Sequence, residues 1–274
     1  MGGVRLGRGD RLPAVSGRIR VERQGRIGWL VFDHPERRNA ISVGMWSAMP
    51  EAVRGLAGDD EVRVIVLRGA GEKAFVSGAD VSEFESRRTG SAAADYDRAS
   101  VAAVGALLQL EKPVLAMVHG FCLGGGVAVS LAADLRYAAD DAVFAIPAAR
   151  LGVGYAMAGI EALANVVGIS AAKEIFFTAR RFRADEALRM GLVNQVVPKA
   201  ELEDRVRETA ERIAGNAPLS LRSVKQIAGE LAKEPAARDH AKVAAGIRAC
   251  LESEDYREGM RAFLEKRRPV FRGR

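Results

Sequence analysis

The sequence holds only two cysteines and three histidines in 274 residues, and this scarcity argues against several classes of protein. Cys122 and Cys250 lie far apart, so we expect no disulfide framework and interpret both as free thiols. No cysteine–histidine cluster has metal-ligand spacing, so no bound metal is expected. No apolar run approaches the roughly 20 residues that a bilayer-spanning helix needs. These features predict a cytoplasmic protein with no metal and no membrane segment.

Residues 1–17 are rich in glycine and arginine and lack an apolar centre, which predicts a disordered extension and not a signal peptide. The formal net charge is +6, yet the basic residues are spread over both halves of the chain and form no recognisable nucleic-acid motif. We therefore expect no nucleic-acid partner. A positive field also suits a small polyanionic ligand.

The first part of the chain alternates predicted strands and helices. Strand patterns occupy residues 18–23, 26–32, 63–69, 113–118 and 142–145, helical spacing occupies 43–58 and 92–110, and 75–80 is expected to be a loop. Strands separated by helices are typical of an α/β fold with parallel pairing. After about residue 157 the predicted structure is mostly helical, over 158–167, 170–178, 184–190, 200–215, 218–232, 236–252 and 255–265, with one short strand near 190–198.

The most distinctive segment is HGFCLGGG, residues 119–126. It follows the predicted strand 113–118 and precedes an apolar helix at 127–133, so glycines stand where a strand ends and a helix begins. Free backbone N–H groups at a helix start carry partial positive charge, and glycine lets a ligand approach them closely. This arrangement suits an oxyanion and therefore favours acyl chemistry.

Several motifs, taken in order along the chain, carry a resemblance to a known family. They are HPERRNA at 34–40, AFVSGAD at 74–80, the glycine run 124–126, ALRMGLV at 187–193, and Phe263 with Lys266. With them the chain resembles the crotonase superfamily, that is, the enoyl-CoA hydratase/isomerase family, from about residue 18 to residue 272. The resemblance implies an α/β fold in which a spiral of β-β-α turns, residues 18–200, binds acyl-CoA. A helical C-terminal region, residues 201–274, would mediate assembly into a homotrimer or a dimer of trimers.

The resemblance also implies how a coenzyme A thioester is held. Its oxygen accepts hydrogen bonds from two backbone N–H groups, which correspond here to Ala79 and Gly125. The implied coenzyme contacts are Arg37, Arg38, Asn39, Ala40, Ser77, Gly78, Asp80 and Gly124, with Phe263 and Lys266 added from the C-terminal helix. Guanidinium groups match phosphate geometry, which favours Arg37 and Arg38 as phosphate partners. Coenzyme A enters as part of the substrate, and no separate cofactor is implied.

The chain departs from the family's pattern at the two glutamates that hydratases use. The corresponding positions are Ala128 and Ala148, and neither side chain can transfer a proton. Hydration needs a base for water and an acid for the alpha carbon, each worth roughly 10²–10⁴-fold in rate. The usual hydratase mechanism is therefore disfavoured. Isomerases of the family also rely on a carboxylate near the second position, so the same change weighs against isomerisation.

Decarboxylation fits the missing carboxylates, because its electrons come from the breaking C–C bond and an oxyanion hole stabilises the enolate. Residues 151–180 and 253–267 are partly similar to the methylmalonyl-CoA decarboxylases of the family, in which a tyrosine at the position of Tyr155 lies in the active site. Tyr155 would hold a carboxylate or relay a proton; the alternative is a buried ring bonded to backbone. Two other functions stay open: a hydratase or isomerase with acid and base groups from elsewhere, and a non-catalytic acyl-CoA binder.

Three further predictions concern the surroundings of this site. The segment 82–105 is expected to shape the acyl end of the pocket. His119 is interpreted as a hydrogen-bonded core histidine and Cys122 as a packing residue.

Overall fold

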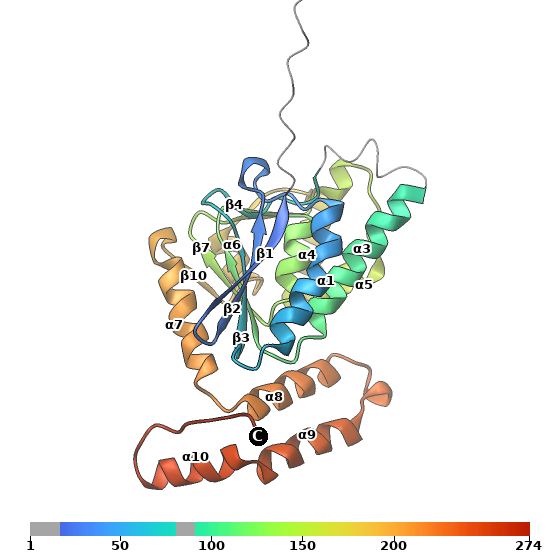
Figure 1. Ribbon diagram of the computed structural model, residues 1–274. Helices are drawn as coiled ribbons and strands as arrows, with labels where there is room; N and C mark the ends of the chain where they lie inside the picture. Colours follow the sequence, from blue (N-terminus) through green and yellow to red (C-terminus); the bar gives the residue numbers. More distant parts are fainter. Residues whose placement is uncertain (1–16, 81–90) are drawn as a thin grey trace, which may run out of the picture.

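The computed structural model describes residues 17–80 and 91–274, which form two β-sheets and their covering helices (Figure 1). The larger sheet consists of β1 (Arg18–Gln24), β2 (Ile27–Asp33), β3 (Val64–Gly69), β5 (Val114–Val118), β7 (Leu135–Ala139) and β10 (Gln195–Val197), in that order. The smaller sheet consists of β4 (Ala74–Val76), β6 (Phe121–Leu123), β8 (Val143–Ala145) and β9 (Phe182–Arg183). The α-helices are α1 (Val43–Gly58), α3 (Ser91–Leu108), α4 (Gly125–Leu131), α5 (Met157–Thr178), α6 (Ala184–Arg189), α7 (Leu202–Ala214), α8 (Pro218–Leu231), α9 (His240–Glu252) and α10 (Glu254–Leu264).

Successive turns of the chain give one strand to each sheet and then a helix. β3, β4 and α3 form one turn, β5, β6 and α4 form the next, and β7 and β8 with α5 form a third. Equivalent strands pair in parallel, β3 with β5 and β5 with β7 in the larger sheet, and β4 with β6 and β6 with β8 in the smaller. This confirms the predicted α/β fold, a spiral of β-β-α turns with parallel pairing.

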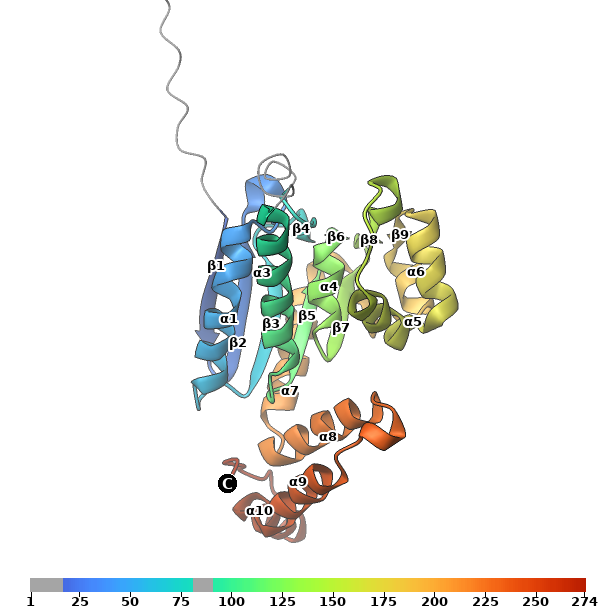
Figure 2. The ribbon, with the colours of Figure 1, turned by 90° about the vertical axis from the view of Figure 1, so that its right-hand side faces the viewer.

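Strands β2, β3 and β5 of the larger sheet are buried on both faces, and because successive residues of a strand point to opposite sides, each strand contributes to two cores. In β3, Ile65 and Leu67 join the core formed with α1 and α3, whereas Val64 and Val66 join the core formed with α7. Figure 2 shows α1 and α3 on one side of the sheet. Helix α7 lies in the predicted C-terminal region, residues 201–274, but it packs on the larger sheet. The helices that lie apart from the sheet begin with α8.

The long predicted elements are confirmed, and so are the short strands predicted at 142–145 (β8) and near 190–198 (β10), whereas β4, β6, β7 and β9 were missed. The segment 75–80, predicted to be a loop, begins inside β4. Strand β6 lies between β5 and the glycine run, where no further strand was expected. Strands of two or three residues carry little periodicity. Strand β7 escaped prediction because its Arg136 is buried, with Nε donating to the oxygen of Leu192 at 2.8 Å. The predicted break in α5 is confirmed at Gly168, whose φ is +78°.

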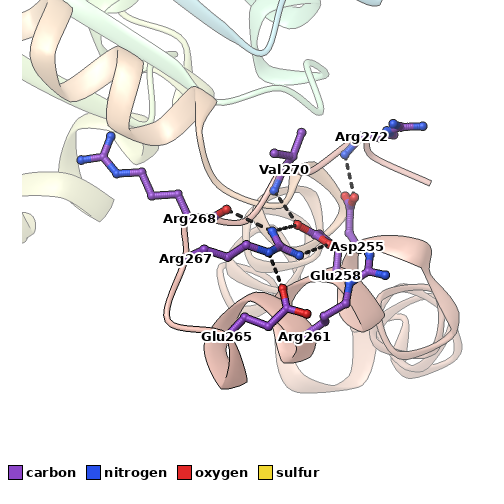
Figure 3. Close-up of polar contacts among 8 residues, drawn as sticks. All are labelled: Asp255, Glu258, Arg261, Glu265, Arg267, Arg268, Val270 and Arg272. Atoms are coloured by element: carbon purple, nitrogen blue, oxygen red, sulfur yellow. Dashed lines mark hydrogen bonds and ion pairs between the residues drawn. The ribbon is translucent and has the colours of Figure 1, made fainter.

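Helices α8, α9 and α10 form a separate layer at one end of the molecule, and β4 lies at the other end (Figures 1 and 2). Polar contacts hold its outer part together (Figure 3). Glu258 on α10 accepts from Arg261 at 2.8 Å, from Arg267 at 2.6 Å and from the backbone of Val270 at 3.0 Å. The hydrogen bonds from Arg267 and Arg261 hold the pKa of the Glu258 carboxyl far below its usual range.

The predicted N-terminal extension lies, apart from Gly17, outside the described residues. None of the helices that the structure describes is long and apolar enough to cross a membrane. Within residues 17–80 and 91–274, no group of histidine, cysteine and acidic side chains could hold a metal ion.

Candidate active site

The predicted oxyanion-binding amides, those of Ala79 and Gly125, lie next to each other. Gly125 is the first residue of α4, so its N–H has no acceptor within the helix. Gly124 caps the helix with φ +50° and ψ −109°, a conformation that favours glycine. A Cβ atom on residue 125 would lie 3.9 Å from the carbonyl carbon of Gly78, which is bonded to the nitrogen of Ala79.

The N–H of Ala79 points away from Ile41, the residue with which Ala79 forms an isolated β-bridge. The nitrogen of Ile41 donates to the oxygen of Gly78 at 2.8 Å, and that of Asp80 donates to the oxygen of Ile41 at 3.1 Å. These bonds form a parallel bridge between Ile41 and Ala79, so the N–H of Ala79 points to the opposite side. The N–H of Gly125 therefore has no acceptor within its helix and that of Ala79 has none across the bridge, as the donors of an oxyanion hole require.

Close packing requires glycine in the third position of the run. A Cβ on Gly126 would lie 2.2 Å from the oxygen of Val76, far inside contact distance. Strand β4 and the start of α4 are thereby pressed together, which fixes the loop 77–80 against the helix N-terminus.

The two segments predicted to hold coenzyme A lie side by side. The nitrogen of Ser77 donates to the oxygen of Arg38 at 3.1 Å, and its hydroxyl donates to the oxygen of Arg37 at 3.3 Å. Both arginine side chains are exposed, while Ala40 and Asp80 are buried beneath this seam. The structure thus brings the predicted residues of segments 37–40 and 77–80 together.

Arg38 lies in cationic surroundings that suit a phosphate. Its guanidinium carbon is 5.0 Å from the centre of the Phe121 ring, and that of Arg181 is 5.6 Å from the same ring. A surface hollow of about 380 Å³ is lined by the basic residues Arg38, Lys73 and Lys199 and by the acidic residues Glu72 and Asp141. Lys199 is paired with Asp141 at 2.8 Å, so the hollow has a small excess of positive charge.

The prediction for Asn39 needs correction. Its side chain is fully buried and donates to the oxygens of Ala70 at 2.9 Å and Ala74 at 2.8 Å. Its amide oxygen accepts from the nitrogen of His34 at 2.9 Å. Both amide hydrogens are used, so the side chain has none to offer a ligand. Asn39 instead fastens the coenzyme loop to the β3–β4 connection.

Phe263 and Lys266 do not lie near the two amides within one chain. Phe263 is at the end of α10 and 82% exposed, and Lys266 follows it, also exposed. In both views α10 lies at the opposite end of the molecule from β4 and the start of α4 (Figures 1 and 2). The structure therefore does not bring these two predicted coenzyme contacts together with the amides of Ala79 and Gly125.

Ala128 and Ala148, which occupy the two positions where the resemblance implied glutamates, lie close to the core. Ala128 is in α4, where its nitrogen donates to the oxygen of Gly124 at 3.2 Å. Ala148 lies in η3 (Pro147–Arg150), is 8% exposed, and accepts from the nitrogen of Leu151 at 3.0 Å. Neither position carries a proton-transferring side chain.

Tyr155 lies in the loop before α5 and is half-buried. Its ring packs edge-on against Phe176, with ring centres 4.8 Å apart. A Cβ on Gly159 would come within 3.1 Å of the same ring, so α5 determines where the ring lies. Its role at the thioester stays a prediction.

Cys122 and His119 are both buried. Burial raises the pKa of the Cys122 thiol to about 12, which suits the predicted packing role. The His119 pKa is lowered, first by burial and then by Lys199, and its ring is bonded to the backbone of Gly71. Its Nε2 has no hydrogen-bond partner among the described residues, so only one of the two ring nitrogens of His119 is hydrogen-bonded.

Sequence reasoning missed Trp46, which lies beside Gly125, and Tyr96, which is hydrogen-bonded to Trp46. A Cβ on that glycine would lie 3.3 Å from Cζ2 of Trp46, and the indole Nε1 donates to the hydroxyl of Tyr96 at 2.9 Å. Trp46 shares the helical spacing of its buried neighbours Met45 and Met49, so it resembled ordinary core. Tyr96 falls in the segment 82–105 predicted to shape the acyl pocket, of which residues 82–90 lie outside the described part.

Comparison with known proteins agrees with this geometry. The enoyl-CoA hydratase/isomerase family profile matches residues 22–274. A short-chain-enoyl-CoA hydratase of Clostridium acetobutylicum is 35% identical over 253 residues, covering 90% of this chain and 95% of that protein. A carnitinyl-CoA dehydratase of Escherichia coli O157:H7 is 36% identical over 265 residues, covering 95% and 100%.

A solved structure extends the similarity to three dimensions. The crystal structure of an enoyl-CoA hydratase/carnithine racemase from Magnetospirillum magneticum superposes with a TM-score of 0.89 at 35% identity, covering 93% of this chain and 96% of that one. Fold and glycine site thus define a crotonase-fold protein. The chain belongs to the enoyl-CoA hydratase/isomerase family.

Proposed function

We propose that this protein is a lyase that acts on an acyl-CoA thioester through an enolate. The observation that carries the proposal is the pair of adjacent amides at Ala79 and Gly125. The N–H of Gly125 has no acceptor within α4, and the N–H of Ala79 takes no part in the bridge to Ile41. As charge develops at the alpha carbon, the thioester oxygen becomes an oxyanion that both amides stabilise. One such donor is worth about 2.7–4 kcal/mol of barrier.

The coenzyme would lie along the seam between residues 37–40 and 77–80. Arg37 and Arg38 are exposed at its edge, where their guanidinium groups can pair with phosphate oxygens. In an assembly of several copies, Phe263 and Lys266 would come from a second copy, because one chain holds them at the far end. The homotrimer or dimer of trimers is therefore part of this proposal, as is the absence of any cofactor besides the substrate's own coenzyme.

Addition or removal of water is the reaction that the names of the relatives favour, since these are a hydratase and a dehydratase. This reaction needs a proton acceptor for water and a donor for the alpha carbon. Ala128 and Ala148 supply neither, so other side chains would have to do so. Tyr155 and the segment that contains residues 81–90 are the places to search.

Decarboxylation is the second candidate, favoured by those same two alanines. The bond between the alpha carbon and the carboxylate breaks, its electron pair passes into the enolate, and carbon dioxide leaves. A proton from solvent or from Tyr155 then reaches the alpha carbon. A pocket without carboxylates at positions 128 and 148 avoids repelling the substrate's own negative charge.

The proposal is tested by incubating the purified protein with crotonyl-CoA and, separately, with methylmalonyl-CoA, and following both by mass. A gain of one water identifies the hydratase reaction, and a loss of carbon dioxide identifies the decarboxylase. Calorimetry with the same two thioesters measures binding. Binding without turnover would mean a non-catalytic acyl-CoA binder, and absence of binding would overturn the proposal.

A further inference from the structure

Trp46 covers one side of the proposed oxyanion hole. The Cα–Cβ direction of a helical residue tilts toward the helix N-terminus, so a Cβ on Gly125 would point toward the open end of α4. That position is 3.3 Å from Cζ2 and 3.8 Å from Cη2 of Trp46, and a Cβ there would already be tight against the indole. The glycine thus leaves room for an aromatic edge directly beside its amide.

The indole is held in place by a polar contact inside the core. Cζ2 adjoins the ring carbon that carries Nε1, so the edge facing Gly125 is also the edge that donates to Tyr96. The Nε1–hydroxyl distance is 2.9 Å, and the two rings meet edge-on with centres 6.5 Å apart. Trp46 is 2% and Tyr96 6% exposed. A buried indole N–H without a partner would cost free energy, so the tyrosine hydroxyl fixes the orientation of the ring.

We propose that Trp46 and Tyr96 form the wall of the acyl pocket beside Gly125 and position the thioester carbonyl against the two amides. The inference rests on the proposed function, since it needs a thioester at Ala79 and Gly125. Both residues act as positioning residues: Trp46 limits where the acyl group can lie, and Tyr96 holds Trp46. They come from α1 and α3, which pack together along one side of the sheet (Figure 2).

The two tryptophans of the chain make this inference directly testable. Trp29 belongs to the core on the α7 side of the larger sheet, whereas Trp46 belongs to the core on the α1 side. A Trp29→Phe protein reports only on Trp46, and the matched Trp46→Phe protein reports only on Trp29. The probes are crotonyl-CoA and coenzyme A alone.

Saturating crotonyl-CoA should change the emission of Trp46 in the Trp29→Phe protein and leave that of Trp29 unchanged in the Trp46→Phe protein. Coenzyme A alone should change Trp46 less, because it carries no acyl group. Unchanged Trp46 emission while calorimetry shows crotonyl-CoA binding would overturn the inference and leave the proposed function standing. No binding at all would overturn both.

A second measurement separates positioning from packing. Tyr96→Phe removes the hydroxyl and keeps the ring, and Tyr137→Phe, on β7, is the matched control because Tyr137 packs on the α7 side. With the thioester that the mass assay identifies as substrate, Tyr96→Phe should lower kcat about tenfold with little change in KM, as a small misplacement does. Equal kcat values for the two variants would contradict the positioning role.

Discussion

Phenylalanines occupy opposite environments at the two ends of this molecule. Phe32 and Phe75 in the core are fully buried with ring centres 5.8 Å apart, whereas Phe263 on α10 is 82% exposed. Helix α9 buries no residue at all, and its neighbour α10 is tied down mainly by the contacts of Glu258 and Asp255 (Figure 3). Hydrophobic burial thus stabilises the end that holds the proposed site. The outer part of the C-terminal layer is held by hydrogen bonds and ion pairs to the carboxylates of Asp255 and Glu258, and it leaves apolar side chains such as Phe263 exposed.

The sharpest test of this comparison replaces one phenylalanine at each end. Phe32→Ala should lower the free energy of unfolding by about 3–5 kcal/mol, because it removes a fully buried ring. Phe263→Ala should change it by less than about 0.5 kcal/mol in the single chain. Urea denaturation of dilute protein measures both. Equal losses would break the comparison and indicate that Phe263 is buried in an assembly.

The next test removes a hydrogen-bond donor at the core end. Gly125→Pro deletes the N–H, and proline is tolerated in the first helical position. Turnover of the acyl-CoA substrate should fall about 10²–10³-fold. Gly125→Ala keeps the donor and adds only a methyl group near Trp46, so its loss should be smaller. Equal losses in the two variants would show that the amide is not the cause.

A third test uses pH to weaken the C-terminal layer. The pKa of Glu258 lies below its unfolded value of about 4.3, so its contribution to stability is present at neutral pH and is lost as pH falls below that value. The thermal midpoint, followed by circular dichroism down to about pH 3, should show this loss. Glu258→Gln should reduce that acid sensitivity, while Glu265→Gln, whose carboxylate contacts only Arg267 among the described bonds, should reduce it less.

The mildest test compares the two thiols, one at each end. Cys122 is fully buried and its thiol pKa is raised to about 12, whereas Cys250 on α9 is half-buried. An alkylating reagent at neutral pH should modify Cys250 first and reach Cys122 only after unfolding. Mass spectrometry of digested protein locates the label, and Cys250→Ser should abolish the early reaction. Early labelling of Cys122 would mean that the core end opens easily.

Much of the fold could be predicted because its long elements carry clear periodicity. Strand β3 alternates between two cores and α1 repeats its apolar face, so both were found. Of the smaller sheet only β8 was predicted, because its other strands have two or three residues and depend on neighbours far along the chain. Strand β7 was hidden by an arginine whose charge is satisfied only by carbonyls that the fold brings to it.

The site was predictable where it depends on backbone and unpredictable where it depends on side-chain contacts. Glycines at a helix start indicate free amides in the run 124–126, and the family resemblance then singled out Gly125. Asn39 was assigned to the coenzyme because its motif pointed there, although its amide is used up inside the protein. Trp46 and Tyr96 are fifty positions apart, and no local pattern reveals their hydrogen bond.

The seam between residues 37–40 and 77–80 bears on how the protein would bind an incomplete substrate. The backbone nitrogen of Ser77 donates to the oxygen of Arg38, and that of Ile41 donates to the oxygen of Gly78. The proposed oxyanion hole is therefore preorganised by the protein's own backbone, which lowers the free energy needed to order it when a thioester binds. A thioester cut down to its pantetheine arm lacks the phosphates that Arg37 and Arg38 would pair with, so it should bind more weakly than the whole molecule.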